Sequence, residues 1–187
     1  MASALLVAVA EIGDKTQILS FVLAARLKKP APIILGILAA TVANHALAAW
    51  VGVFAAAWLP PSLLPWILGL MFIGFGIWAL HPDSLDDEPA PYRAGAFVTA
   101  LIAFFVAEMG DKTQFATVAL AARYDAIAAV VSGTTVGMMA ANIPAVLVGD
   151  ALTRKIPMKL VRWIAAAVFV MTGIATIAGA PSPVRYS

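Results

Sequence analysis

Long apolar stretches make up most of the chain, and short polar stretches separate them. The polar stretches also hold the helix-breaking residues, at RLKKPAP, LPPSLLP, HPDSLDDEPAPYR, RYD and TRKIPMK. An α-helix needs roughly 20 residues to cross the ~30 Å hydrocarbon core of a bilayer. The pattern therefore predicts six membrane-spanning helices, at 3–25, 31–58, 63–80, 96–122, 126–151 and 160–180.

The composition also indicates an all-α integral membrane protein. Hydrophobic residues make up 63% of the 187 residues and charged residues 12%, with a mean hydropathy of +0.95, well above the apolar share of soluble domains. The net charge of +2 is too small an imbalance to indicate a surface for nucleic acid. The chain has no cysteine, so any metal must be held by oxygen ligands, alone or with an imidazole.

The second half of the chain repeats the first at a constant offset. EIGDKTQILSFVLAAR at 11–26 aligns with EMGDKTQFATVALAAR at 108–123, and the register continues without a gap to the end of the sixth span. It pairs Gly36 with Gly133, Gly52 with Gly149, Pro60 with Pro157, Trp66 with Trp163, Phe72 with Phe169 and Gly76 with Gly173. We expect one membrane domain made of two three-helix repeats, 1–80 and 96–187, joined by an acidic linker at 81–95.

An odd number of spans in each repeat predicts that the two repeats have inverted topology, an architecture that places a transport site near the membrane midplane. One side of the six-span arrangement holds most of the basic residues, namely Arg26, Lys28, Lys29, Arg93, Arg154, Lys155, Lys159 and Arg162, and the other holds Arg123 and Arg185. The positive-inside rule places the first side, with the acidic loop DSLDDE, in the cytoplasm and both termini outside. The apolar N-terminus lacks a basic n-region, so we expect a mature helix rather than a signal peptide.

Charged residues lie in the middle of the first and fourth predicted spans. Each charge at the centre of a spanning helix costs about 2.5–3.5 kcal/mol, so six facing lipid would cost roughly 15–20 kcal/mol. They are Glu11, Asp14 and Lys15 in the first span, and Glu108, Asp111 and Lys112 in the fourth. We therefore expect all six to face the protein interior.

A helical projection places Glu11, Asp14, Lys15 and Gln17 on one broad face. Thr16 falls near the back of an unbroken helix. Gly13 allows either close helix packing or a local break, and the sequence leaves both open.

The two polar segments together form a site that suits a divalent cation. They supply four carboxylates, two amides from Gln17 and Gln114, and two ammonium groups, with a formal charge of −2. Carboxylate and amide oxygens favour Ca²⁺, Mg²⁺ and Mn²⁺, and the lack of sulfur ligands argues against copper(I) and favours zinc less. We expect each lysine to pair with the glutamate four residues before it. Competition between the ammonium group and the cation is the alternative.

Two copies of E-x-G-D-K-T, one in each half, resemble the Gdt family, the relatives of transmembrane protein 165. The motif residues are Glu11, Gly13, Asp14, Lys15 and Thr16, and Glu108, Gly110, Asp111, Lys112 and Thr113. The resemblance covers almost the whole chain and implies a small transporter of Mn²⁺ and Ca²⁺ that exchanges these ions for protons. It also implies that the acidic residues carry the ion, and that the protein lies in a bacterial inner membrane.

Further polar residues lie in the second and fifth spans. Asn44 and His45 are near the middle of the second span, and Asn142 occupies the position that pairs with His45. We expect His45 to be a hydrogen-bonded structural residue, with a ligand or proton-relay role as the alternative. Asn142, two residues before Pro144, is expected to stabilise a helix kink.

Three other functions fit the charged residues less well. Buried ion pairs stabilise a fold poorly compared with apolar packing, which argues against a purely structural role. An intramembrane aspartyl protease would use a G-x-G-D motif. Here a lysine follows each aspartate and opposes the proton that a catalytic pair must share. A channel is disfavoured because deep charged sites bind and release ions rather than conduct them rapidly.

The prediction is therefore a secondary transporter, not an enzyme. We expect Glu11, Asp14, Glu108 and Asp111 to bind the cation, and entering protons to drive Mn²⁺ export, with Ca²⁺/H⁺ exchange at the same site as the alternative. Supporting or proton-coupling roles are expected for Lys15, Thr16, Gln17, Lys112, Thr113, Gln114, Asn44, His45 and Asn142. We expect no prosthetic group. The expected partners are the metal ion, protons and the lipid bilayer, and the oligomeric state is left open.

Overall fold

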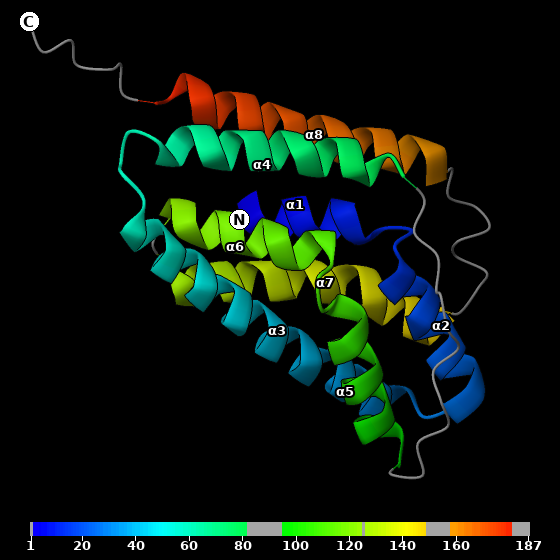
Figure 1. Cartoon of the computed structure of the whole chain (residues 1–187). Coiled ribbons are helices and arrows are strands. Elements are labelled where there is room, and N and C mark those ends of the chain that lie inside the picture. The colour runs from blue at the N-terminus through cyan, green and yellow to red at the C-terminus, as the bar shows by residue number, and fades with distance from the viewer. Residues whose placement is uncertain (1, 82–94, 125, 149–157, 181–187) are drawn as a thin grey trace, which may run out of the picture.

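The computed structural model describes residues 2–81, 95–124, 126–148 and 158–180, in which the regular structure is helical (Figure 1). The helices are α1 (Ala2–Glu11), α2 (Lys15–Leu27), α3 (Pro30–Trp58), α4 (Leu64–Ala79), α5 (Gly95–Glu108), α6 (Lys112–Tyr124), α7 (Ile127–Val148) and α8 (Met158–Ala178). Almost all of the predicted acidic linker lies outside the described residues, as do the end of the fifth predicted span and the residues Arg93, Arg154, Lys155 and Arg185.

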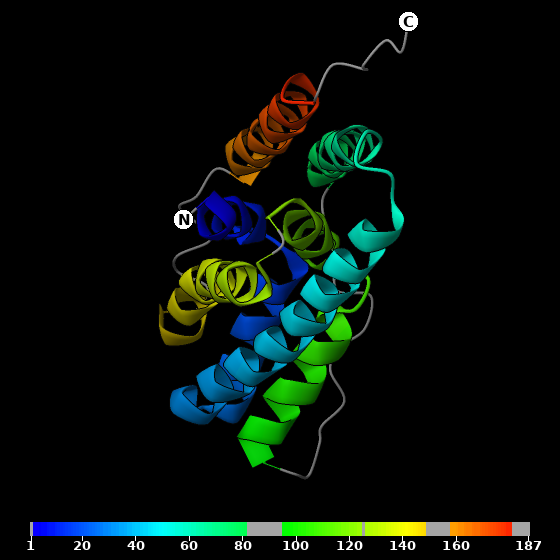
Figure 2. The same ribbon diagram turned by 90° about the vertical axis from the view of Figure 1, so that its left-hand side faces the viewer.

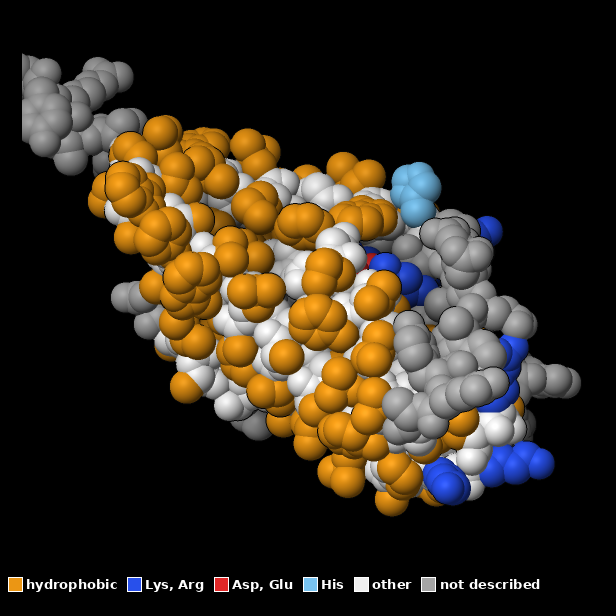
Figure 3. Space-filling model, turned by 60° about the horizontal axis from the view of Figure 1, so that its bottom comes forward, with side chains coloured by type: hydrophobic (Ala, Val, Ile, Leu, Met, Phe, Trp, Pro, Cys, Tyr) orange, Lys and Arg blue, Asp and Glu red, His pale blue; other side chains and the backbone are white. Residues whose placement is uncertain are grey.

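Within the described residues, three helices are long and apolar enough to cross a membrane: α3, α7 and α8. Helices α4 and α5 are shorter apolar helices. Large apolar side chains cover much of the surface (Figure 3), and Leu5, Trp58 and Leu70 are more than half exposed. A water-soluble protein rarely exposes so large an apolar area, whereas lipid accommodates it. The protein is therefore an integral membrane protein.

The first and fourth predicted spans are each interrupted at the charged motif. Helix α1 ends at Glu11 and α2 begins at Lys15, while α5 ends at Glu108 and α6 begins at Lys112. Gly13 has φ 81° and Gly110 has φ 76°, a left-handed conformation that glycine adopts without steric cost. Of the two roles that the sequence left open for Gly13, the structure shows the local break.

Each interrupted pair of helices packs on the long apolar helix of the other half. Helix α3 lies along α5 and α6, α7 lies along α1 and α2, and α4 packs beside α8 (Figures 1 and 2). Glycines allow the close approach. A Cβ on Gly36 of α3 would lie 2.5 Å from the Phe97 carbonyl oxygen of α5, and one on its repeat partner Gly133 of α7 would lie 2.3 Å from Ser3 Oγ of α1. Equivalent helix pairs therefore use equivalent glycines.

The buried apolar side chains form two clusters, and both interrupted helices pass from one cluster to the other. Ala10 of α1 belongs to the cluster around Phe72 and Phe169, whereas Leu19 of α2 belongs to the other. In the same way, α6 contributes to the first cluster and α5, through Phe104, to the second. The two helix breaks, with their charged side chains, therefore lie between two apolar cores.

Candidate cation-binding site

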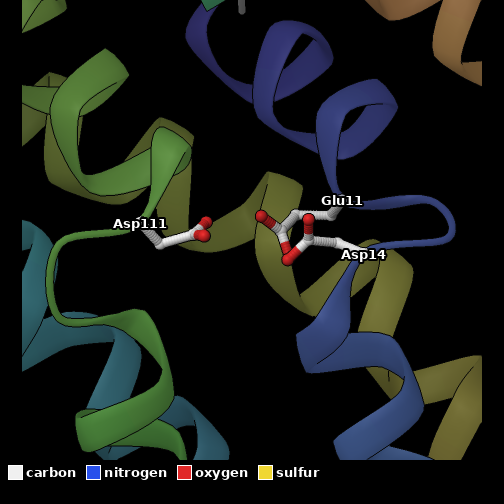
Figure 4. A group of neighbouring side chains, drawn as sticks. All are labelled: Glu11, Asp14 and Asp111. Carbon is white, nitrogen blue, oxygen red and sulfur yellow. The ribbon is translucent and has the colours of Figure 1, made fainter. Parts of the chain in front are cut away.

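The two helix breaks bring three carboxylates together. Glu11 and Asp14, from the α1–α2 break, point toward Asp111 of the α5–α6 break (Figure 4). One oxygen from each of the three lies within 4.8 Å of the others, and all three side chains are buried. Hard divalent cations favour such a group of carboxylate oxygens. Glu108 is also fully buried but does not belong to this group of three.

The lysines pair with the aspartates of the opposite motif. Lys15 Nζ lies 2.8 Å from Asp111 Oδ1, and Lys112 forms an ion pair with Asp14. The expected pairing of each lysine with the glutamate four residues earlier is wrong. That expectation required a continuous helix, whereas the glutamate here ends one helix and the lysine begins the next. The ion pairs therefore join the two halves of the chain.

Each glutamate has one oxygen near a threonine hydroxyl and a second oxygen that accepts no hydrogen bond from the described part of the chain. Thr16 Oγ1 donates to Glu11 Oε2 at 2.6 Å, and Thr113 Oγ1 donates to Glu108 Oε2 at 3.3 Å. Among the described residues, the buried Glu11 Oε1 and Glu108 Oε1 have no hydrogen-bond partner. Because the helix is broken, Thr16 faces the site and not the back of a continuous helix. With each aspartate paired to a lysine, the glutamates carry the site's formal surplus charge of −2.

The two glutamines stabilise the helix breaks. Gly13 N–H donates to Gln17 Oε1 at 2.9 Å, and Gly110 N–H donates to Gln114 Oε1 at 2.8 Å. The amide oxygens that we expected to assist the cation therefore accept backbone hydrogen bonds in this structure. Satisfying these N–H groups matters because an unpaired backbone donor away from water is costly.

Asparagines on the long helices α3 and α7 form hydrogen bonds with the shorter helices that pack beside them. Asn44 Nδ2 of α3 donates to the Phe105 carbonyl of α5 at 3.0 Å, and Asn44 Oδ1 accepts from Gln114 Nε2 at 3.5 Å. On α7, Asn142 Oδ1 accepts from Ser20 Oγ of α2 at 2.7 Å. Sequence reasoning missed Ser20. Its position three residues after Gln17, on the same face of an apolar helix, was the available signal.

His45 departs from the expectation of a hydrogen-bonded structural residue. It is fully buried on α3, and neither ring nitrogen has a hydrogen-bond partner in the part of the chain that the structure describes. The residue at the paired position, Asn142, is fully hydrogen-bonded by comparison. It donates to the Met138 carbonyl at 3.1 Å and accepts from Ser20.

Comparison with known proteins identifies the family. The family described as "Divalent cation/proton antiporter GDT1" matches residues 1–87 and 96–183. The chain belongs to the GDT1 family. It is 52% identical over 171 residues to a Vibrio cholerae protein named "Putative manganese exporter", a match that covers 91% of this chain and 86% of the relative.

More distant GDT1-like proteins match most of the chain as well. GDT1-like protein 5 of Arabidopsis thaliana is 26% identical, with 89% of this chain and 90% of the relative covered. A GDT1-like protein of Synechocystis is 29% identical, with 92% and 93% covered. No solved structure gives a significant match.

Membership of the GDT1 family, together with the apolar helices, makes the protein a membrane transporter of cations, which is consistent with the expectation of a transporter rather than an enzyme. Each of the two matched ranges contains one E-x-G-D-K-T motif and one helix break. In this GDT1 protein, Glu11 and Asp14 of the first motif meet Asp111 of the second in the interior.

Proposed function

We propose that the protein exports Mn²⁺ across the membrane in exchange for entering protons, through Glu11, Asp14, Glu108 and Asp111. The observation that carries the proposal is the buried meeting of carboxylates from the two motifs, with ligand oxygens within 4.8 Å of one another. Family membership supports cation/proton exchange as the activity.

The charges of the site suit an exchange of one divalent cation for protons. Glu11 and Glu108 supply a formal charge of −2 beyond the two aspartate–lysine pairs, which one divalent cation or two protons would neutralise. Each keeps a buried oxygen that accepts no hydrogen bond from the described residues. A cation and protons would compete for these oxygens, so proton entry would release the cation and cation entry would release the protons. This competition is the proposed coupling.

The pairs between Lys15 and Asp111 and between Lys112 and Asp14 would couple binding to movement. We propose six spans arranged as two inverted repeats, one of which rocks against the other. The exchange of helix partners between the halves supports this arrangement, since α3 contacts α5 as α7 contacts α1. A cation bound by the aspartates would displace both ammonium groups. The halves would then lose the ion pairs that join them and could change their relative position.

We propose that the end of the molecule rich in lysine and arginine faces the cytoplasm of a bacterial cell. Lysine and arginine side chains gather at one end of the face shown in Figure 3. Arg26, Lys28 and Lys29 lie at or just after the end of α2, and Lys159 lies at the beginning of α8. The positive-inside rule then leaves both termini outside and the acidic linker inside. Export would load the cation from this basic end.

Ca²⁺/H⁺ exchange at the same site is the second candidate, because Mn²⁺ and Ca²⁺ share a preference for carboxylate oxygens. The name of the Vibrio cholerae relative favours manganese.

Flux measurements on purified protein in liposomes test the proposed exchange. Mn²⁺, Ca²⁺ and Mg²⁺ are offered separately with an imposed pH gradient, with the gradient collapsed by a protonophore, and with protein-free liposomes. We expect Mn²⁺ movement that requires the protein and is faster with an opposing proton gradient. The pH of the liposome lumen should change as Mn²⁺ moves, in the direction that corresponds to protons moving the opposite way. Mn²⁺ flux without proton movement would contradict exchange, and a higher rate for Ca²⁺ would favour the second candidate.

A further inference from the structure

A pocket opens beside the Asp14–Lys112 ion pair, at the basic end of the molecule. It holds about 10 Å³ of space for water-sized molecules between the α1–α2 break, the end of α4 and the beginning of α8, and it is partly open to the surface. Its lining includes Gly13, Asp14, Ala79, Lys112, Arg162 and Ala165. The pocket therefore gives a narrow route from that end of the molecule to Asp14.

Arg162 adds a positive charge to this route. Its side chain is half-buried on α8 and makes no ion pair or hydrogen bond with the residues that the structure describes. Arg123 on α6 differs, because it donates to Thr176 and lies over the Tyr124 ring, 5.4 Å from the centroid. Within the described residues, no carboxylate forms an ion pair with Arg162.

The repeat of the sequence gives Arg162 no equivalent arginine in the first half of the chain. The offset between the halves pairs Asp14 with Asp111 and Lys112 with Lys15, but it pairs Arg162 with Pro65. The charged groups of the site are therefore duplicated, whereas the arginine on the route to Asp14 is not. Arg162 can therefore affect cations that approach from one end of the molecule more strongly than cations that approach from the other.

We propose that Arg162 sets the affinity with which the site takes up divalent cations from the basic end. This inference rests on the proposed exchange function. A fixed positive charge repels a divalent cation twice as strongly as a monovalent one, and the repulsion weakens as salt screens it. Arg162 lowers the occupancy of the site when the cation concentration at the basic end is low. Export therefore rises when that concentration is elevated and removes few cations when it is not.

Sided transport assays on charge variants test the role of Arg162. Everted and right-side-out membrane vesicles, with orientation established by protease access to a C-terminal tag, are supplied with Mn²⁺ and a driving pH gradient. We expect Arg162→Gln to lower the half-saturating Mn²⁺ concentration at the basic end roughly three- to tenfold, from the Coulomb energy of a screened charge. The shift should shrink at high salt and be absent at the opposite end.

Two further variants separate charge from structure. Lys159→Gln removes a positive charge from the exposed start of the same helix and should shift the value less than twofold, whereas Arg162→Lys should keep the wild-type value. The inference fails if Arg162→Gln behaves like Lys159→Gln, or if Arg162→Lys behaves like Arg162→Gln. If the wild-type protein transports Mn²⁺ in these same vesicles, such a failure leaves the proposed function standing. If it transports no cation, both proposals fall.

Discussion

The two motif breaks contain the same residues in the same order but make different contacts. In the first, Thr16 donates to Glu11 alone among the described residues, at 2.6 Å. In the second, the Thr113 hydroxyl lies 3.3 Å from Glu108 and 3.2 Å from Asp111, so it is shared between two carboxylates. Repetition of a sequence therefore does not impose identical surroundings on its copies.

The two ion pairs also differ in burial. The Lys112 side chain, paired with Asp14, is 5% exposed, whereas that of Lys15, paired with Asp111, is 24% exposed. Glu11 belongs to the group of three carboxylates and Glu108 does not. In the inverted-repeat arrangement that we propose, the two halves would exchange their surroundings as the transporter changes state. The asymmetry between the breaks is thus the property expected to reverse during transport, and variants of paired residues can test it.

The largest effect on transport is expected from the aspartates of the two motifs, because both should be necessary. Asp14→Asn and Asp111→Asn keep the size of the side chain but remove the negative charge that attracts the cation. Each should reduce Mn²⁺ transport by about 100-fold or more, since loss of a supporting ligand alone costs 10–100-fold. Flux in liposomes measures the loss, and gel filtration of the purified variants checks that they fold. Full transport by either variant would remove that aspartate from the mechanism.

The next effect should distinguish the two copies. Lys112→Gln leaves Asp14 as a buried charge without its lysine, and breaking a buried pair in this way costs about 3–5 kcal/mol. Lys15→Gln should cost less, because that lysine is partly exposed and Asp111 keeps its contacts with the Thr113 N–H and hydroxyl. Thermal unfolding in one detergent compares the two variants. Equal destabilisation would show that the difference in burial does not describe the state populated in detergent.

Much of the fold could be predicted because membrane insertion restricts the sequence strongly. Helix α3 was expected at 31–58 and runs over Pro30–Trp58, and α8 was expected at 160–180 and runs over Met158–Ala178. Apolar length and flanking helix breakers suffice for such boundaries. Burial of the charged residues was also predictable, since exposing them to lipid is costly.

The pairing within the site could not be predicted from local spacing. A helical projection assumes a rotation of 100° per residue, and that assumption fails at Gly13 and Gly110, where φ is positive. Beyond each break the projected faces no longer apply, so Thr16 turns toward Glu11. The partners of Lys15 and Lys112 lie on the other half of the chain, and their choice depends on how the halves pack.

A smaller effect is expected from fixing the backbone at the second break. The Cβ added by Gly110→Ala would have no neighbouring atom within 4 Å. The loss of stability would therefore come from the positive φ alone, about 1–2 kcal/mol. Gly74 in α4 also has open space around it but lies inside a helix. Gly74→Ala should therefore stabilise the protein, by about 0.5–1 kcal/mol. A lower unfolding temperature for Gly110→Ala and a higher one for Gly74→Ala would support the helix break at Gly110. Equal shifts would argue for a continuous helix at Gly110.

The smallest effect is expected at His45, where the copies differ in sequence. His45→Leu removes an imidazole that has no hydrogen-bond partner among the described residues, and replacing an unpaired polar group with an apolar one changes stability by less than about 1 kcal/mol. Asn142→Leu, the matched control, takes the acceptor from Ser20 and should destabilise more. Transport by His45→Leu should stay within about twofold of wild type at every pH tested. A changed pH profile with unchanged stability would instead place His45 on the proton route, because a structural residue would not alter that profile alone.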